Sequence, residues 1–297
     1  MRRWFGGITL VAVAVVTVTL TGCSTPAGVD ANLIDDWAPL DTPKVWTPIS
    51  NTCHPQVRDD SVATFQPVDC GRPHRAETVH VGEFDGDGRA TGTPPAPGSA
   101  PVRAAYQECD RAAREVVGAD WRIGRLAIAL ILPRAEAWTA GARWYRCDLQ
   151  ETRSLDDDTA VVRTASLRGA LMGPSPLAHG CFQPKLIGNE INFMEPVSCD
   201  APHRAEFAGI HRAPDSTYEV FERNRERIHR SCMSTVATFA GLPDNNEIGV
   251  RVGSIIYRPD AAAWALGERG VQCFLWVSDR DLTRSAQGAG PTLLPAA

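Results

Sequence analysis

The chain has 297 residues, with 30 Lys and Arg against 35 Asp and Glu, and its formal net charge is -5 at pH 7. This length allows one large domain or two small ones. The acidic balance argues against nucleic-acid binding, which usually needs a basic face.

The first 22 residues have the pattern of a secretory signal peptide. Arg2 and Arg3 give a positive start, and the 16 positions 5–20 contain no charged residue. This run is shorter than the ~20 residues that a membrane span needs. It ends in Leu20-Thr21-Gly22-Cys23, which resembles the bacterial lipobox. We therefore predict cleavage before Cys23, attachment of lipid to its thiol, and a location on the outer face of the cell membrane. The alternative is a plain signal-anchor helix with an incidental cysteine.

Residues 23–50 are predicted to be the lipidated cysteine and a tether. The segment begins with small and polar residues and contains a proline close to Cys23. It also contains Trp37 and Trp46. A pure tether rarely carries tryptophan, so we expect part of this segment to pack against a domain.

The spacing of the other cysteines predicts that the rest of the chain is a duplication. The first four are separated by 17, 39 and 38 positions, and the second four by 18, 33 and 41. These eight residues are Cys53, Cys70, Cys109, Cys147, Cys181, Cys199, Cys232 and Cys273. Self-similarity at a fixed offset is the signature of a repeated structural unit.

Two further motifs recur in register with the cysteines. The sequence Pro-His-Arg-Ala-Glu occurs at 73–77 and again at 202–206. Each copy also ends in Pro-x4-Trp-x2-Gly-x-Arg-x3-Cys, at 133–147 and 259–273. We therefore predict two tandem homologous domains, joined by a linker and followed by a disordered tail. The boundaries are 51–168 for copy 1, 169–180 for the linker, 181–285 for copy 2 and 286–297 for the tail.

Each copy is predicted to be a small α+β domain with a short antiparallel sheet and one main helix. Apolar residues at helical spacing predict helices over 102–117 and 218–240, and Gly118 and Gly241 suit the left-handed position that ends a helix. Partly alternating apolar runs predict strands over 123–132, 144–149, 248–257 and 271–277, with two more strands opening each copy. The acidic run 156–158 is predicted to be a solvated turn, and Val161-Val162 a closing strand.

An even number of cysteines in an exported chain predicts a disulfide framework. A zinc site is less favoured, because no two cysteines have the separation of a zinc knuckle. An opening hairpin in each copy would pair Cys53 with Cys70 and Cys181 with Cys199. The remaining cysteines would then join helix to last strand, as Cys109–Cys147 and Cys232–Cys273. Four cysteines allow three pairings in each copy, so the others stay open.

The repeated His-x-x-Glu pairs are the sharpest candidates for chemistry. His74 with Glu77, and His203 with Glu206, have the groups needed for proton transfer or metal binding. The favoured interpretation is structural, with Glu77 and Glu206 paired to the arginines of the closing motifs. Those arginines are Arg143 and Arg269. Trp138 and Trp264 are ligand-stacking candidates, with core packing the favoured role.

Together these motifs resemble the septum formation domain family. The residues that carry the resemblance are Val-x-Cys-x2-Pro-His-x-Ala-Glu, the helix cysteine and Trp-x2-Gly-x-Arg-x3-Cys, in two copies over roughly 44–285. The stretch 163–169 is similar to the end of that domain. The resemblance implies an exported or membrane-anchored protein of actinobacteria that acts in the cell envelope at division. It implies no catalytic residues, metal or cofactor.

The sequence thus leaves three functional hypotheses. The first is a non-enzymatic, lipid-anchored module that binds an envelope protein, a division protein or peptidoglycan. The second is a small hydrolase or metal-binding protein that uses the His-x-x-Glu pairs. The third is a redox or metal-handling protein, which free thiols in the folded chain would support.

Overall fold

The computed structural model describes residues 45–296, apart from 57–65, 189 and 246. The predicted signal peptide, the lipobox with Cys23, and Trp37 lie outside the described residues. Among those that are described, no helix combines the length and the hydropathy needed to cross a bilayer.

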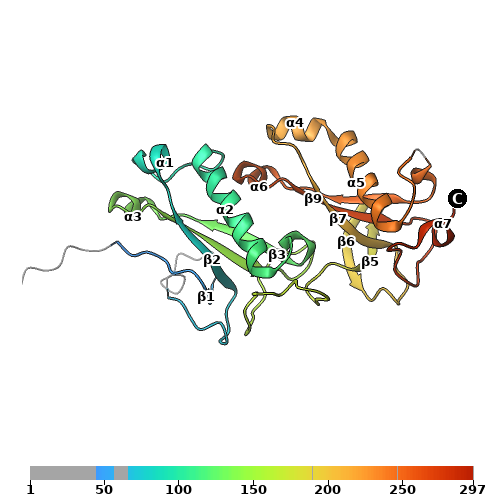
Figure 1. Ribbon diagram of the computed structural model, residues 1–297, viewed down its shortest axis with the longest axis horizontal. Coiled ribbons are helices and arrows are strands. Elements are labelled where there is room, and N and C mark those ends of the chain that lie inside the picture. The colour runs from blue at the N-terminus through green and yellow to red at the C-terminus, as the bar shows by residue number, and fades with distance from the viewer. Residues whose placement is uncertain (1–44, 57–65, 189, 246, 297) are drawn as a thin grey trace, which may run out of the picture. The chain divides into compact units, whose positions relative to one another are not determined.

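Four antiparallel strands and one long helix form the first half of the structure. The strands are β1 (Thr52–His54), β2 (Ala76–Glu83), β3 (Leu126–Ile131) and β4 (Trp144–Glu151), in the order β1-β2-β4-β3. Helix α2 (Ala100–Val117) packs against this sheet, as Figure 1 shows. It buries Cys109, Ala113 and Val117 in the core. Gly118 ends the helix at φ 85°, a left-handed conformation that glycine adopts at little cost.

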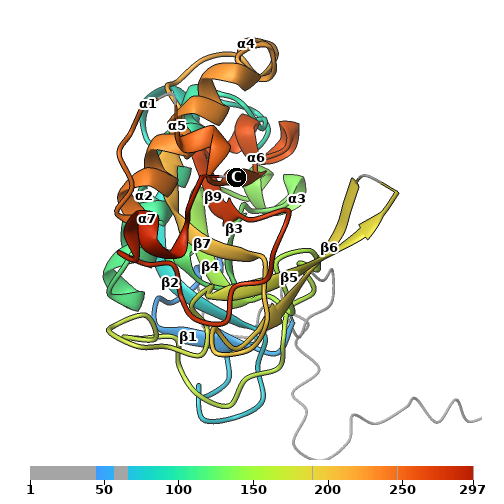
Figure 2. The same cartoon turned by 90° about the vertical axis from the view of Figure 1, so that its right-hand side faces the viewer.

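The second half repeats this arrangement with one additional strand. Its strands are β5 (Cys181–Ile187), β6 (Glu190–Val197), β7 (Ala205–Arg212), β8 (Gly253–Tyr257) and β9 (Gly270–Trp276). Their order is β6-β5-β7-β9-β8, so β5-β7-β9-β8 repeats β1-β2-β4-β3. Helix α5 (Arg225–Ala240) packs on β7, β8 and β9. Figure 2 shows the β5–β6 hairpin extending beyond the rest of this sheet. The α+β class and the two antiparallel sheets are confirmed.

The remaining elements are short. They are α1 (Gly86–Ala90), η2 (Trp121–Ile123), α3 (Ala135–Thr139), α4 (Tyr218–Arg223), η3 (Ile248–Val250), α6 (Ala261–Leu266) and α7 (Gly290–Leu293). The helix predicted over 218–240 is therefore two helices, α4 and α5, divided at Asn224. The side-chain amide of Asn224 donates to the carbonyl of Val220, 2.7 Å away, and such local bonds compete with helix propagation.

All four predicted disulfides are present. Cys53–Cys70 and Cys181–Cys199 close the opening segments, and Cys109–Cys147 and Cys232–Cys273 join the long helices to β4 and β9. The four cysteines of the helix-to-strand bridges are all 0% exposed. None of the eight cysteines is left as a free thiol.

The predicted linker and the predicted disordered tail are both corrected by the structure. In the linker, Leu171 and Leu177 are buried in the first core. In the tail, α7 folds over residues 290–293, and Leu294 is 0% exposed within the second core. Both segments are rich in Gly, Pro and Ala, but a few leucines are enough to hold them in place. Residues 45–297 form one compact unit.

The acidic run is also not a free turn. One carboxylate oxygen of Asp156 accepts from the backbone N–H of Met194 on β6, at 2.7 Å, and the other accepts from the Tyr257 hydroxyl on β8, at 2.5 Å. Asp156 thus provides a hydrogen-bond acceptor for a backbone N–H of β6, at the edge of the second sheet. The predicted closing strand at 161–162 is replaced by single bridges at Ala160 and Arg163.

The described end of the segment before the first copy contacts that copy through Trp46, as was expected for part of the segment. The indole N–H of Trp144 donates to the Trp46 carbonyl at 3.0 Å. The two rings lie edge to face, with centroids 5.5 Å apart. Trp46 is therefore part of the folded unit.

His179, in the former linker, gives a pH-dependent prediction. It lies against the rings of Phe182, Phe207 and Phe274. Burial, reinforced by the positive charge of Arg125, lowers its pKa from 6.5 to about 4. The unfolded chain therefore binds a proton at higher pH than the folded chain, and stability is lost as the pH falls from 6.5 towards 4.

We expect this effect to contribute about 3 kcal/mol to the acid sensitivity of folding. Urea unfolding at pH 7 and pH 4 should show that His179→Gln reduces the loss of unfolding free energy by about that amount. The matched control is His229→Gln, which removes an exposed imidazole on α5. Equal pH dependence of wild type and His179→Gln would contradict the prediction.

Candidate functional site

The repeated His-x-x-Glu motif lies at the entrance of the second strand of each four-strand unit. In the first copy, His74 exchanges backbone hydrogen bonds with Arg163, and β2 begins at Ala76. In the second copy, His203 does the same with Leu282, and β7 begins at Ala205. The motif therefore joins the start of a central strand to a segment that lies far along the chain.

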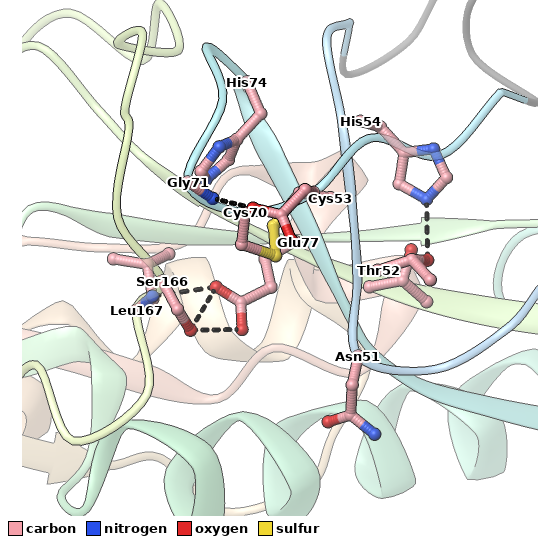
Figure 3. Close-up of a disulfide and its surroundings, with 12 residues drawn as sticks. Asn51, Thr52, Cys53, His54, Cys70, Gly71, His74, Glu77, Ser166 and Leu167 are labelled. Carbon is pink, nitrogen blue, oxygen red and sulfur yellow. Dashed lines mark hydrogen bonds between the residues drawn. A yellow bond between two sulfur atoms is a disulfide. The ribbon is translucent and has the colours of Figure 1, made fainter.

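Glu77 holds that distant segment in the first copy. Its carboxylate accepts from the Ser166 hydroxyl at 2.8 and 3.0 Å, and from the backbone N–H of Leu167 at 2.8 Å. Figure 3 shows this carboxylate pointing at Ser166 and Leu167, beside the Cys53–Cys70 disulfide. Glu77 is 3% exposed, so its bonds are shielded from solvent.

Glu206 has the equivalent partners in the second copy. It accepts from the Ser285 hydroxyl and from the backbone N–H of Ala286, both at 2.7 Å. It also binds His203 Nε2 at 3.0 Å. The Nδ1 atom of His203 lies 2.8 Å from the carbonyl of Ala201. Each ring nitrogen of His203 thus lies within hydrogen-bond distance of an oxygen, one from a carbonyl and one from the Glu206 carboxylate.

The first copy lacks this pair. His74 Nδ1 donates to the Arg72 carbonyl at 2.7 Å, but among the described residues His74 Nε2 has no hydrogen-bond partner. The two histidines are 2% and 0% exposed. The identical sequence thus produces one His–Glu pair, not two.

A shared motif identifies the segment that the glutamates hold. Residues 163–169 and 282–288 both read x-Thr-x-Ser-x2-Gly, with the serines at 166 and 285. In each copy, the serine hydroxyl also accepts from the backbone N–H two residues later. At the end of the domain, the resemblance to the septum formation family rests on the first of these stretches alone, because the predicted end of copy 2 at residue 285 divides the second. Aligning the two copies beyond the last cysteine would have found it.

The predicted pairing of the glutamates with Arg143 and Arg269 is wrong. Each arginine lies over the ring of the tryptophan in its own closing motif, with guanidinium-to-centroid distances of 4.2 Å to Trp138 and 3.9 Å to Trp264. Each also donates to that tryptophan's carbonyl at 2.7 Å. Arg269 additionally binds Asp215. The turn after each tryptophan brings the arginine back onto it, so the local contact prevails over the cross-strand one.

The two tryptophans are core residues and have no free face for a ligand. Trp138 is 1% exposed and Trp264 is 3% exposed. Phe221 stacks on Trp264 with centroids 4.1 Å apart, and Phe84 meets Trp138 edge-on at 5.8 Å. With an arginine on the other side, each indole is enclosed.

Two clusters bring potential metal ligands together, but both include oxidised cysteines. Ligand atoms of Cys53, Cys70 and Glu77 lie within 4.8 Å of one another, and so do those of Cys181, His203 and Glu206. A cysteine binds metal as a thiolate, and a disulfide sulfur has no thiolate to offer. In the disulfide-bonded protein, neither cluster has the donors of a metal site.

A buried network of charged residues joins the two halves of the structure. Glu268 of the second half accepts from the Tyr106 hydroxyl at 2.5 Å and from Arg122 at 2.7 and 2.8 Å. Arg122 also binds Asp110 at 2.7 Å and Asp120 at 3.0 Å. Arg122 is 4% exposed and Glu268 is 7% exposed.

The charges in this network shift each other's pKa values. Burial opposes ionisation of Asp110, but Arg122 outweighs it and lowers the pKa of that carboxyl group. Burial and the negative charge of Glu268 raise the pKa of the Tyr106 hydroxyl well above its usual value. Asp110 therefore stays ionised beside Arg122, while Tyr106 stays protonated. The position of Glu268 within its closing motif is occupied by Ala142 in the first copy, and sequence analysis did not single it out.

The fold and its buried glutamate contacts define a disulfide-bonded α+β protein with two antiparallel sheets, in which a repeated polar motif ties each sheet to a segment further along the chain. The model of a family described as septum formation matches residues 50–273, and the chain belongs to that family. Membership connects the protein with the cell envelope and cell division. No curated protein and no solved structure was found to match the chain.

Proposed function

We propose that this protein is a lipid-anchored, non-enzymatic binding or scaffolding module on the outer face of the cell membrane, with a role in septum formation. The observation that carries the proposal is that both His-x-x-Glu motifs hold the fold together. Their glutamates are buried and bonded to Ser166 and Ser285, so these groups serve the fold. The family and the four disulfides support an envelope location.

The alternative of a hydrolase or a metal-binding protein is less well supported. Such a site needs a His and a carboxylate that converge on a surface open to substrate. His203 and Glu206 do converge, but they are 0% and 2% exposed. A substrate would have to displace the 282–288 segment to reach them.

The anchor is proposed from the lipobox-like end of the apolar run. Two or more acyl chains hold a protein stably at a bilayer, since each buried methylene contributes ~0.8 kcal/mol. We expect Cys23→Ala to move the protein out of the membrane fraction or to leave it unprocessed with its signal attached. Fractionation of producing cells, with the mass of the N-terminal peptide, measures both outcomes.

Ser24→Ala is the matched control, because it changes the neighbouring residue and leaves the thiol. It should fractionate with the membrane, as the wild type does. Unchanged processing and membrane retention of Cys23→Ala would contradict the lipid anchor and favour a signal-anchor helix.

The binding role is tested by proximity labelling in the native cell, with the labelling enzyme fused to the C-terminal end of the protein. A binding module at the septum should label envelope or division components and concentrate at division sites. A uniformly distributed protein with the same labelled set as an unrelated lipoprotein would contradict the role.

A further inference from the structure

A groove lined by arginines lies where the two halves meet. One cavity of about 560 Å³ is lined by residues of α2, by Arg122, and by Arg212 and Arg269 of the second half. A second cavity of about 360 Å³ is lined by Arg103, by residues 215–218 and by Trp264. Arg269 lines both cavities, so the two are neighbours on either side of one guanidinium-bearing side chain, and together they are called the interface groove hereafter.

The interface groove is positively charged in an acidic chain. Six arginines line its two cavities, against three carboxylates. These arginines are Arg103, Arg111, Arg114, Arg122, Arg212 and Arg269. The carboxylates are Asp110, Glu115 and Asp215. When Asp120 and Glu268, which bind Arg122 from behind, are included, the groove still has one excess positive charge, whereas the chain has a net charge of -5.

The floor of the groove is built from buried charges, so its shape is fixed. Asp110 and Arg122 are 6% and 4% exposed and both line the larger cavity. Asp110 also binds Arg114, and accepts from the Trp121 indole at 3.0 Å. Arg212 lies over this floor, 3.4 Å from Asp110, with a side chain that is 45% exposed.

The guanidinium groups extend further than one anion can reach. Arg103, Arg111 and Arg114 occupy one side of α2, and eleven residues of helix cover about 16 Å. Arg111 is exposed and, within the described part of the chain, forms no ion pair. Guanidinium groups bind phosphate and carboxylate in bidentate geometry, which favours a ligand with several such groups along its length.

We propose that the interface groove binds a soluble polyanion that carries repeated phosphate or carboxylate groups. This gives the proposed binding role a class of ligand, and it rests on that role. The second half contributes Arg212 and Arg269, so neither half has the complete site alone. This provides a reason for the buried Arg122–Glu268 contact that holds the halves together.

The test is a titration of the full chain, in micelles of a neutral detergent, with inorganic polyphosphate. We expect saturable binding that weakens as salt is added. Arg111→Glu with Arg212→Glu should lower the affinity at least about tenfold, because two charge-assisted contacts become repulsive. Glu115→Gln, which removes a carboxylate from the groove, should raise it.

The matched control is Arg227→Glu with Arg230→Glu, on the exposed side of α5, which changes the net charge equally. This control should bind as the wild type does. Arg111→Gln with Arg212→Gln serves as a milder variant if charge reversal disturbs folding, which near-ultraviolet circular dichroism and the unfolding temperature would show.

Absence of saturable binding, or an equal loss in the groove and control variants, would overturn the proposal. Equally strong binding of short-chain phosphatidylglycerol in the micelles, which carries a single phosphate, would also overturn it, because a lipid headgroup and not a soluble polyanion would then be the ligand. The proposed envelope role is measured separately, by labelling in cells. If the protein labels division components in cells but does not bind polyphosphate, the groove proposal is wrong and the proposed envelope role stands.

Discussion

Replacement of Glu268 by alanine is expected to lower the free energy of unfolding by about 3–5 kcal/mol, because it leaves part of a buried ion network uncompensated. Glu268 accepts two bonds from Arg122 and one from Tyr106. After the substitution, Arg122 keeps Asp110 and Asp120, but its side facing the second half is buried without an acceptor. The loss is measured by urea unfolding followed by circular dichroism.

Asp215→Ala provides the control for this variant. Asp215 is also an acidic partner of an arginine in the second half, but its side chain is 81% exposed. Exposed ion pairs contribute only about 0–1 kcal/mol, so the control should be close to the wild type. If both variants lost the same small amount, the Glu268 network would not be a structural link between the halves.

Features encoded locally were predicted well from the sequence. Helix α2 was predicted to within two residues, because its apolar residues recur at helical spacing and Gly118 ends it. The disulfide pairs followed from the position of the opening hairpins and the in-register repeat. Neighbouring residues along the chain determine the helix, whereas the disulfide pairs, 17 to 41 positions apart, follow from the spacing of the repeat.

Contacts between distant segments were predicted less well. The partner of Glu77 is Ser166, 89 positions away, and no periodic pattern connects the two. The predicted partner Arg143 binds the carbonyl of Trp138, five positions away, because the intervening turn makes that contact available first. The tail was predicted to be disordered from its composition, but Ala286 and Leu294 are buried in the second core and Leu293 packs against it.

Differences between the copies were more informative about function than their identities. The shared motifs turn out to build each unit, while Glu268 stands where the first copy has Ala142 and joins the two units. In the same way, His203 binds Glu206 whereas His74 does not bind Glu77. A residue that breaks the repeat can therefore indicate what one copy does for the whole molecule.

The difference between His203, which binds Glu206, and His74, which does not bind Glu77, leads to the second prediction of a large effect. Glu206→Ala should lower the free energy of unfolding by about 3–4 kcal/mol, and Glu77→Ala by about 2–3 kcal/mol. Both changes leave a serine hydroxyl and a buried backbone N–H without their acceptor. Only Glu206→Ala also leaves the buried ring of His203 without its carboxylate partner.

Thermal and urea unfolding give the two values, and limited proteolysis locates the damage. In Glu206→Ala, the first new cleavage should fall within residues 282–294, because Glu206 holds that segment through Ser285 and Ala286. Ser285→Ala is the control, with an expected loss of about 1 kcal/mol for one hydrogen bond. A Glu206→Ala protein of unchanged stability would show that the carboxylate is not needed by the fold. The catalytic alternative would then explain the repeated His-x-x-Glu motif better than the structural one.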